Sequence, residues 1–178
     1  MFHSNTELLI DYWRGLRGDD AVPARNAVEP AGFVALAPRT FIASQVRPGE
    51  FAFRLAGEAL IDLHGRQLRD GLVSRLWRPL QRRRLAGLLE ATLLAGEPLV
   101  VAAEGWSEDG AHLRLEVSFL PLSGPDGDAD RFLGLYQPTL GSLRTRICEL
   151  ALLAAYGVAD EREPLHLRLA TLDGRRIA

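Results

Sequence analysis

The sequence predicts an α+β domain, in which a five-stranded antiparallel sheet has helices over one face. Strand-like runs fall into two groups, before and after a helical middle, and the second group is joined by loops short enough for antiparallel neighbours. A sheet with one apolar face must bury that face, and the helical middle is the nearest segment that can cover it. An amphipathic helix precedes this core, and a helical extension follows it.

The first element is an amphipathic helix. Ser4 and Glu7 have the spacing of a capping box, and apolar residues recur at helical spacing until Gly18. The apolar face of this helix must be buried. We expect it to contact a second copy of the chain, and docking on the domain itself is the alternative. The side chains expected at this dimer contact are Tyr12, Trp13 and Leu16.

Two strands and a helical middle come next. A Pro-Gly turn signal joins the β-rich runs 40–46 and 51–55, which predicts a hairpin. Short helical pieces are expected over residues 57–76, where two glycines interrupt them. A longer helix is expected from about Pro79 to Ala95, because leucines share one face and Gly96 follows.

The second half of the chain contains the clearest strand pattern. Apolar and polar residues alternate from 112 to 119, which predicts a strand with one buried face. Strands at 99–106 and 131–136 complete a meander. Helical spacing of apolar residues then predicts a third helix from Leu143 to Gly157, and the alternation at 165–169 is compatible with a sixth strand.

These elements divide the chain into three parts. Residues 1–38 hold the first helix and an irregular connector, residues 39–138 form the core, and residues 139–178 form a C-terminal helix and tail packed on or beside it.

Composition excludes several classes of protein. The chain has 178 residues, 47% of them apolar and 25% charged, which is typical of one soluble globular domain. It has neither a signal peptide nor an apolar run long enough for a membrane span, so we expect a cytoplasmic protein. Its one cysteine excludes an internal disulfide, and a net charge of −2 gives no bulk attraction to nucleic acid.

Four short strings stand out along the first half of the chain: Tyr12–Arg14, Pro23–Arg25, Phe51–Gly57 and Gly65–Arg66. In this order and spacing they resemble small single-domain bacterial PAS proteins that carry an additional N-terminal helix. The resemblance covers roughly residues 8–138. It implies a five-stranded sheet, helices over one face, a small-molecule pocket between them, and a sensory or scaffolding role.

The chain departs from the cofactor-binding PAS domains that it resembles. Flavin-binding members need a cysteine at the start of the helical middle, whereas the one cysteine here is Cys148. Haem-binding members use a histidine on the long helix, and residues 79–95 contain none. We therefore expect neither cofactor. We also expect no metal, because the calcium-loop spacing that begins at Asp126 lacks the required glycine and glutamate.

Two groups of side chains are candidate binding sites. The first is a ligand pocket formed by Phe53, His64, Trp77 and Trp106. Ordinary core packing is the alternative for its aromatic members, and for His64 a capping role at a helix end, where a protonated histidine is favoured. The second is an anion or partner contact in the basic cluster from Arg75 to Arg84, and its members are Arg75, Arg78, Arg82 and Arg83. A solvated helix face is the alternative for this cluster.

These observations favour a non-catalytic regulatory module that acts by protein contact, as a homodimer with a protein signalling partner. A small-molecule enzyme that uses His64 or Glu104 is the second interpretation, and nucleotide or nucleic-acid binding at the arginine cluster is the third. No phosphate loop, nucleophile elbow or metal-spaced histidine pair occurs in the sequence.

Overall fold

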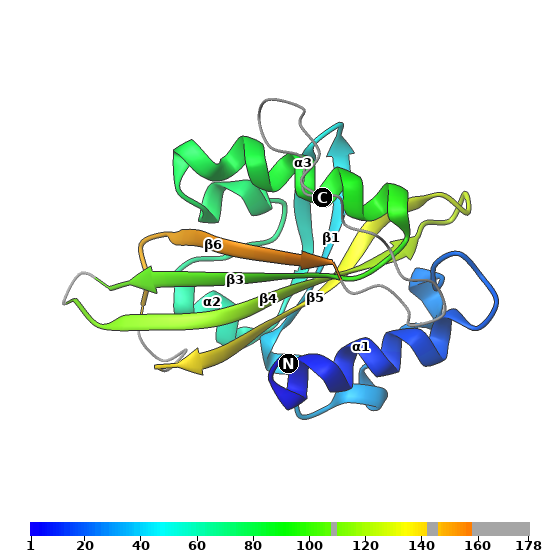
Figure 1. Ribbon diagram of the computed structural model, residues 1–178, viewed down its shortest axis with the longest axis horizontal. Coiled ribbons are helices and arrows are strands. Elements are labelled where there is room, and N and C mark those ends of the chain that lie inside the picture. The colour runs from blue at the N-terminus through cyan, green and yellow to red at the C-terminus, as the bar shows by residue number, and fades with distance from the viewer. Residues whose placement is uncertain (108–109, 142–145, 158–178) are drawn as a thin grey trace, which may run out of the picture.

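The computed structural model describes residues 1–107, 110–141 and 146–157, in which six antiparallel strands form one sheet in the order β2-β1-β5-β4-β3-β6 (Figure 1). The strands are β1 (Thr40–Arg47), β2 (Glu50–Ala56), β3 (Leu99–Trp106), β4 (His112–Ser123), β5 (Ala129–Leu140) and β6 (Leu150–Gly157). The predicted hairpin and the predicted three-stranded meander are both confirmed.

Three α-helices and five short 3-10 turns complete the described chain. The helices are α1 (Ser4–Arg17), α2 (Glu58–His64) and α3 (Arg82–Ala95). The 3-10 turns are η1 (Arg25–Ala27), η2 (Pro30–Phe33), η3 (Ala37–Arg39), η4 (Val73–Leu76) and η5 (Pro79–Gln81). Helix α1 begins as predicted, but its N-cap is His3 instead of Ser4, because the Nδ1 atom of His3 accepts the Asn5 N–H at 3.1 Å.

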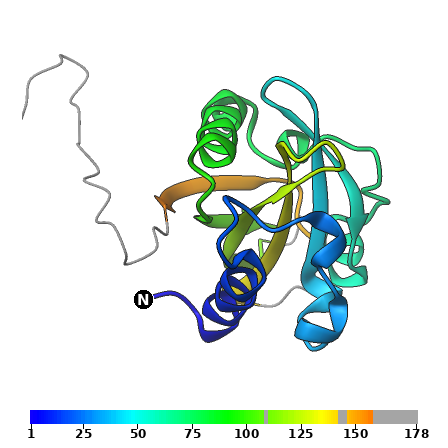
Figure 2. The ribbon, with the colours of Figure 1, turned by 90° about the vertical axis from the view of Figure 1, so that its right-hand side faces the viewer.

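The sheet lies between two helical layers. Figures 1 and 2 show α1 and α3 on opposite sides of it, and α2 contributes Leu60 and Leu63 to the same core cluster as Leu85 of α3. We call the side of α2 and α3 the inner face and the side of α1 the outer face. The sheet thus has an apolar core on each face, whereas the sequence predicted cover on one face.

Aromatic rings fill the centre of the inner core. The ring of Phe41 lies directly over Gly134, its partner in the β1–β5 ladder, where a Cβ atom would leave no room for it. From there it meets Phe53, Phe119 and Tyr136 edge to face, with ring centroids 5.4 to 5.9 Å apart. The chain's own side chains therefore occupy the middle of the space between the sheet and its helices.

Residues 150–157 form a strand, which corrects the predicted C-terminal helix. A run of leucine and alanine suits either structure, and tertiary contacts decide between them. Strand β6 pairs with β3 along its whole length, and this pairing places Leu150 and Leu152 in the inner core. The sheet has six strands for this reason. The other predicted strand, at 165–169, lies outside the described residues.

The stretch that links α2 to α3 lies along both edges of the sheet. At the β2 edge, the backbone of Phe53 exchanges hydrogen bonds with Asp70 and Gly71, at 2.8 and 3.0 Å. At the β6 edge, the Arg78 N–H donates to Leu150 O, and the Gln81 side-chain amide both donates to and accepts from the backbone of Leu152. Residues 70–81 therefore satisfy edge hydrogen-bonding groups on both sides of the sheet.

Candidate functional site

Three of the four predicted pocket residues belong to the inner face. Phe53 and Trp77 are buried in the inner core, and the His64 ring lies edge-on to Tyr136 at 5.9 Å. The prediction is wrong for Trp106, which lies on the outer face. Alternation along β3 explains this, because the neighbouring Gly105 faces Ile147 of the inner core.

His64 is a partly buried, neutral histidine at the end of α2. Burial, together with a smaller effect of the Arg66 charge, lowers the pKa of its imidazole from 6.5 to about 4. Its Nε2 atom is buried without a hydrogen-bond partner in the described part of the chain. The predicted capping role is wrong, because Gly65 ends the helix in the left-handed conformation and burial outweighs the helix dipole.

Two further polar side chains lie in the same interior. Burial raises the pKa of the Tyr136 phenol well above its usual value, so this group stays neutral. The indole Nε1 of Trp77 is buried and, among the described residues, has no hydrogen-bond partner. The interior therefore combines aromatic packing with neutral polar groups.

On the outer face, five side chains gather at the ends of β3 and β4. We call them the Trp106 surface: Arg78, Glu104, Trp106, His112 and Arg114. Trp106 stacks on His112 with ring centroids 5.1 Å apart, and the Arg78 guanidinium lies 5.1 Å from the Trp106 ring. Glu104 Oε2 lies 3.1 Å from His112 Nε2 and 3.7 Å from Arg114 Nε. Glu104 and His64 consequently lie on opposite faces of the sheet.

The sequence contained a signal for the Trp106 surface that we did not use. An Asp-Gly turn signal at 109–110 follows Trp106 in the sequence, and the β3–β4 register pairs Trp106 with His112 and Glu104 with Arg114. The side chain of His112 is only 31% exposed, because Trp106 and Glu104 cover it.

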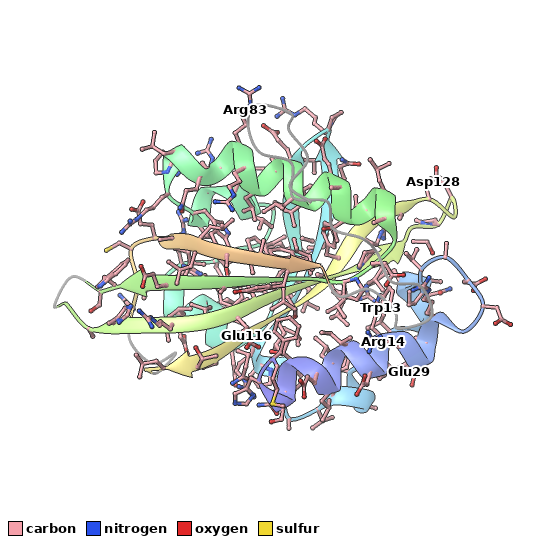
Figure 3. All side chains as sticks on the ribbon, viewed as in Figure 1. Trp13, Arg14, Glu29, Arg83, Glu116 and Asp128 are labelled. Carbon is pink, nitrogen blue, oxygen red and sulfur yellow. The ribbon has the colours of Figure 1, made fainter. Side chains whose placement is uncertain are left out.

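The predicted arginine cluster divides between two places. Three members line an open groove of about 340 Å³, which we call the arginine groove. Its lining residues are Gly49, Glu50, Leu72, Ser74, Arg75, Arg82, Arg83 and Ala86. Arg78 is not among them, because its backbone bonds to Leu150 and its side chain pairs with Glu149 at 3.2 Å. Figure 3 shows Arg83 extending from α3 away from the sheet.

The apolar stripe of α1 docks on its own sheet. Trp13 is 0% exposed, and its indole N–H donates to Pro121 O at 2.6 Å between α1 and the sheet (Figure 3). The Tyr12 hydroxyl donates to Glu29 O at 3.1 Å, and Leu16 packs against the same outer core. The prediction that Trp13 contacts a second copy is therefore wrong, because its own chain already covers it.

Comparisons with known proteins agree with this architecture. A family model described as "PAS domain" matches residues 1–137, so the chain belongs to the PAS domain family. No curated protein matches the chain. Such domains are generally sensory, and none of the helices in the described residues is long and apolar enough to cross a membrane.

Several solved structures are similar in fold at low identity. The Rhodobacter sphaeroides LOV protein is 17% identical, with a TM-score of 0.45 over 57% of this chain and 58% of that one. The dark structure of the blue-light photoreceptor Aureochrome1 LOV is 13% identical, with a TM-score of 0.47 over 64% and 84%. The PAS domain of the fruit-fly ELK potassium channel is 15% identical, with a TM-score of 0.42 over 57% and 85%.

The position of the cysteine bears on the prediction that the chain binds no flavin. The one cysteine, Cys148, is exposed, and its N–H donates to Trp106 O at 3.2 Å, so no thiol lies among the buried rings. The absence of flavin and haem stays a prediction.

Proposed function

We propose that this chain is a non-catalytic PAS regulatory module that binds a partner protein through the Trp106 surface. The observation that supports this proposal is the column of Arg78, Trp106 and His112 on the outer face. Tryptophan and arginine are the residue types that contribute most binding energy at protein interfaces. Glu104 lies on β3, is 17% exposed, and contacts His112, so it holds the imidazole that stacks on Trp106.

The arrangement of the titratable groups also favours contact over catalysis. A general base needs a partner or a reacting atom within hydrogen-bond reach. His64 is partly buried and neutral, and Glu104 faces the other side of the sheet beside His112. A small-molecule ligand on the inner face stays part of the proposal, with Phe53, His64 and Trp77 as its contacts.

The partner contact is tested by the Trp106→Ala variant. We expect it to lose a bound protein that the wild-type chain retains, because truncation of a central interface tryptophan costs about 2 kcal/mol or more, roughly thirtyfold in affinity. Proteins captured by each form from the source cell would be identified by quantitative mass spectrometry, and the affinity for any that differs would then be measured with purified components.

The matched control for this experiment is Leu94→Ala, because Leu94 is a 90% exposed apolar side chain on α3, away from the Trp106 surface. A partner that binds wild type, Trp106→Ala and Leu94→Ala with equal affinity would contradict the assignment of this surface. Turnover of a small molecule by the purified chain would contradict the non-catalytic role.

We also propose that the chain forms a homodimer, with the exposed side of α1 at the contact. Leu8 is 48% exposed on this side, so it is available where Trp13 is not. We expect light scattering to give the mass of a dimer for the wild-type chain and of a monomer for Leu8→Glu. The control is Val34→Glu, at a 68% exposed position in the connector, which should remain dimeric. A wild-type monomer at high micromolar concentration would contradict the proposal.

A further inference from the structure

The arginine groove is built from three segments that are far apart in sequence. The β1–β2 turn contributes Gly49 and Glu50, the stretch after Gly71 contributes Leu72, Ser74 and Arg75, and the first turns of α3 contribute Arg82, Arg83 and Ala86. Its volume of about 340 Å³ lies at the lower end of the range for small-molecule sites.

The three guanidinium groups are not paired with carboxylates. Within residues 1–107, 110–141 and 146–157, Arg75, Arg82 and Arg83 form no ion pair. The one acidic lining residue, Glu50, pairs through Oε2 with Arg47 Nε at 3.2 Å. The lining of the groove therefore carries a net positive charge.

One of these arginines is held in place before any ligand binds. The Nε atom of Arg82 donates to Trp77 O at 3.0 Å, and Trp77 is fully buried in the inner core. This contact orients Arg82 and leaves its terminal nitrogens for another acceptor. Preorganisation of this kind reduces the entropy lost on binding.

We propose that the arginine groove binds a small anion that carries two or more linked phosphate groups. Each guanidinium can donate two parallel hydrogen bonds to phosphate oxygens, and the three guanidinium charges along the groove exceed the charge of about −1.5 to −2 that one phosphate group carries at pH 7. The Ser74 hydroxyl adds one further donor at the same wall. None of its lining residues belongs to the Trp106 surface, so this proposal does not rest on the partner contact proposed there.

The features of the groove favour a small ligand over a nucleic acid. None of the lining residues that the structure describes is aromatic, so bases have no ring on which to stack. The chain as a whole carries a net charge of −2, which repels an extended polyanion beyond the groove itself. Glu90, on the same helix near Gly49, further limits the positive surface to the groove.

The test is calorimetric titration of the full chain with inorganic tripolyphosphate. We expect saturable binding to one site, weakened about a hundredfold in the Arg75→Ala, Arg83→Ala double variant, because each charge-assisted contact contributes about tenfold. Orthophosphate should bind at least tenfold more weakly than tripolyphosphate. A nucleoside diphosphate that competes with tripolyphosphate would identify nucleotides as members of the ligand class.

The matched control is Arg84→Ala, because Arg84 is an exposed arginine beside Arg83 that does not line the groove. It should bind tripolyphosphate within twofold of the wild type, as should Trp106→Ala, whose change is confined to the partner surface. Equal weakening by Arg84→Ala and by the double variant would overturn the proposal, since it would indicate general charge attraction. So would the absence of binding at millimolar tripolyphosphate, or tighter binding of a short DNA duplex or an acidic peptide at the same residues.

Discussion

Replacement of Trp13 by alanine will lower the free energy of unfolding by about 3–5 kcal/mol, the usual cost of removing a fully buried tryptophan. The change removes the ring from the outer core and leaves Pro121 O without its donor. It also removes the ring over which the Arg17 guanidinium lies at 5.5 Å. Urea unfolding, monitored by circular dichroism, measures the free energy of unfolding of the wild type and of Trp13→Ala.

The control for this variant is Leu8→Ala, on the exposed side of the same helix, and both variants are measured at a protein concentration at which the chain is monomeric. There Leu8→Ala should change the free energy of unfolding by less than about 0.5 kcal/mol. If both variants cost the same, α1 does not dock on the sheet in solution. The comparison therefore separates docking of the helix from the dimer contact proposed for Leu8.

Acid will destabilise the fold through His64 by up to about 3 kcal/mol. Its pKa is 6.5 in the unfolded chain and about 4 in the folded one, so the unfolded chain binds more protons between these values. The free energy of unfolding therefore falls as the pH drops from 6.5, and the loss is complete below about pH 4.

His64→Leu isolates this contribution. The difference in unfolding free energy between wild type and variant should depend on pH in this window, because only the wild type contains this imidazole. A matched variant, His112→Leu, should retain the acid sensitivity, because His112 lies on the other face beside Glu104. Equal acid sensitivity in wild type and His64→Leu would show that His64 is already solvated in the folded chain.

The fold could be predicted wherever local pattern and tertiary packing agree. The alternation from 112 to 119 correctly predicted β4, and the glycine after Ala95 correctly predicted the end of α3. Each signal is a local property of the chain. The same reasoning was wrong for residues 150–157, where it predicted a helix. Their apolar spacing fits a helix, and only the presence of an unpaired β3 edge makes them a strand.

The candidate sites were harder to predict than the fold, because each depends on which face of an element a residue occupies. Arg75, Arg82 and Arg83 meet in one groove, while Arg78 lies beside Trp106 because its backbone is tied to β6. Trp13 has the same apolar character whether it contacts a partner or its own sheet. Charge and hydrophobicity identified residues of interest, and three-dimensional contacts assigned their roles.

The stretch from residue 70 to 81 borders two strands that lie at opposite ends of the sheet. Its hydrogen bonds to Phe53 and to Leu152 occupy groups that would otherwise recruit a further strand, so it protects the fold against edge-to-edge aggregation. Because one stretch protects both edges, a single proteolytic cut within it would expose unpaired backbone N–H and C=O groups on both edge strands. Arg75 of the arginine groove lies in this stretch, so an anion bound there would also stabilise the contacts of the stretch with both edge strands.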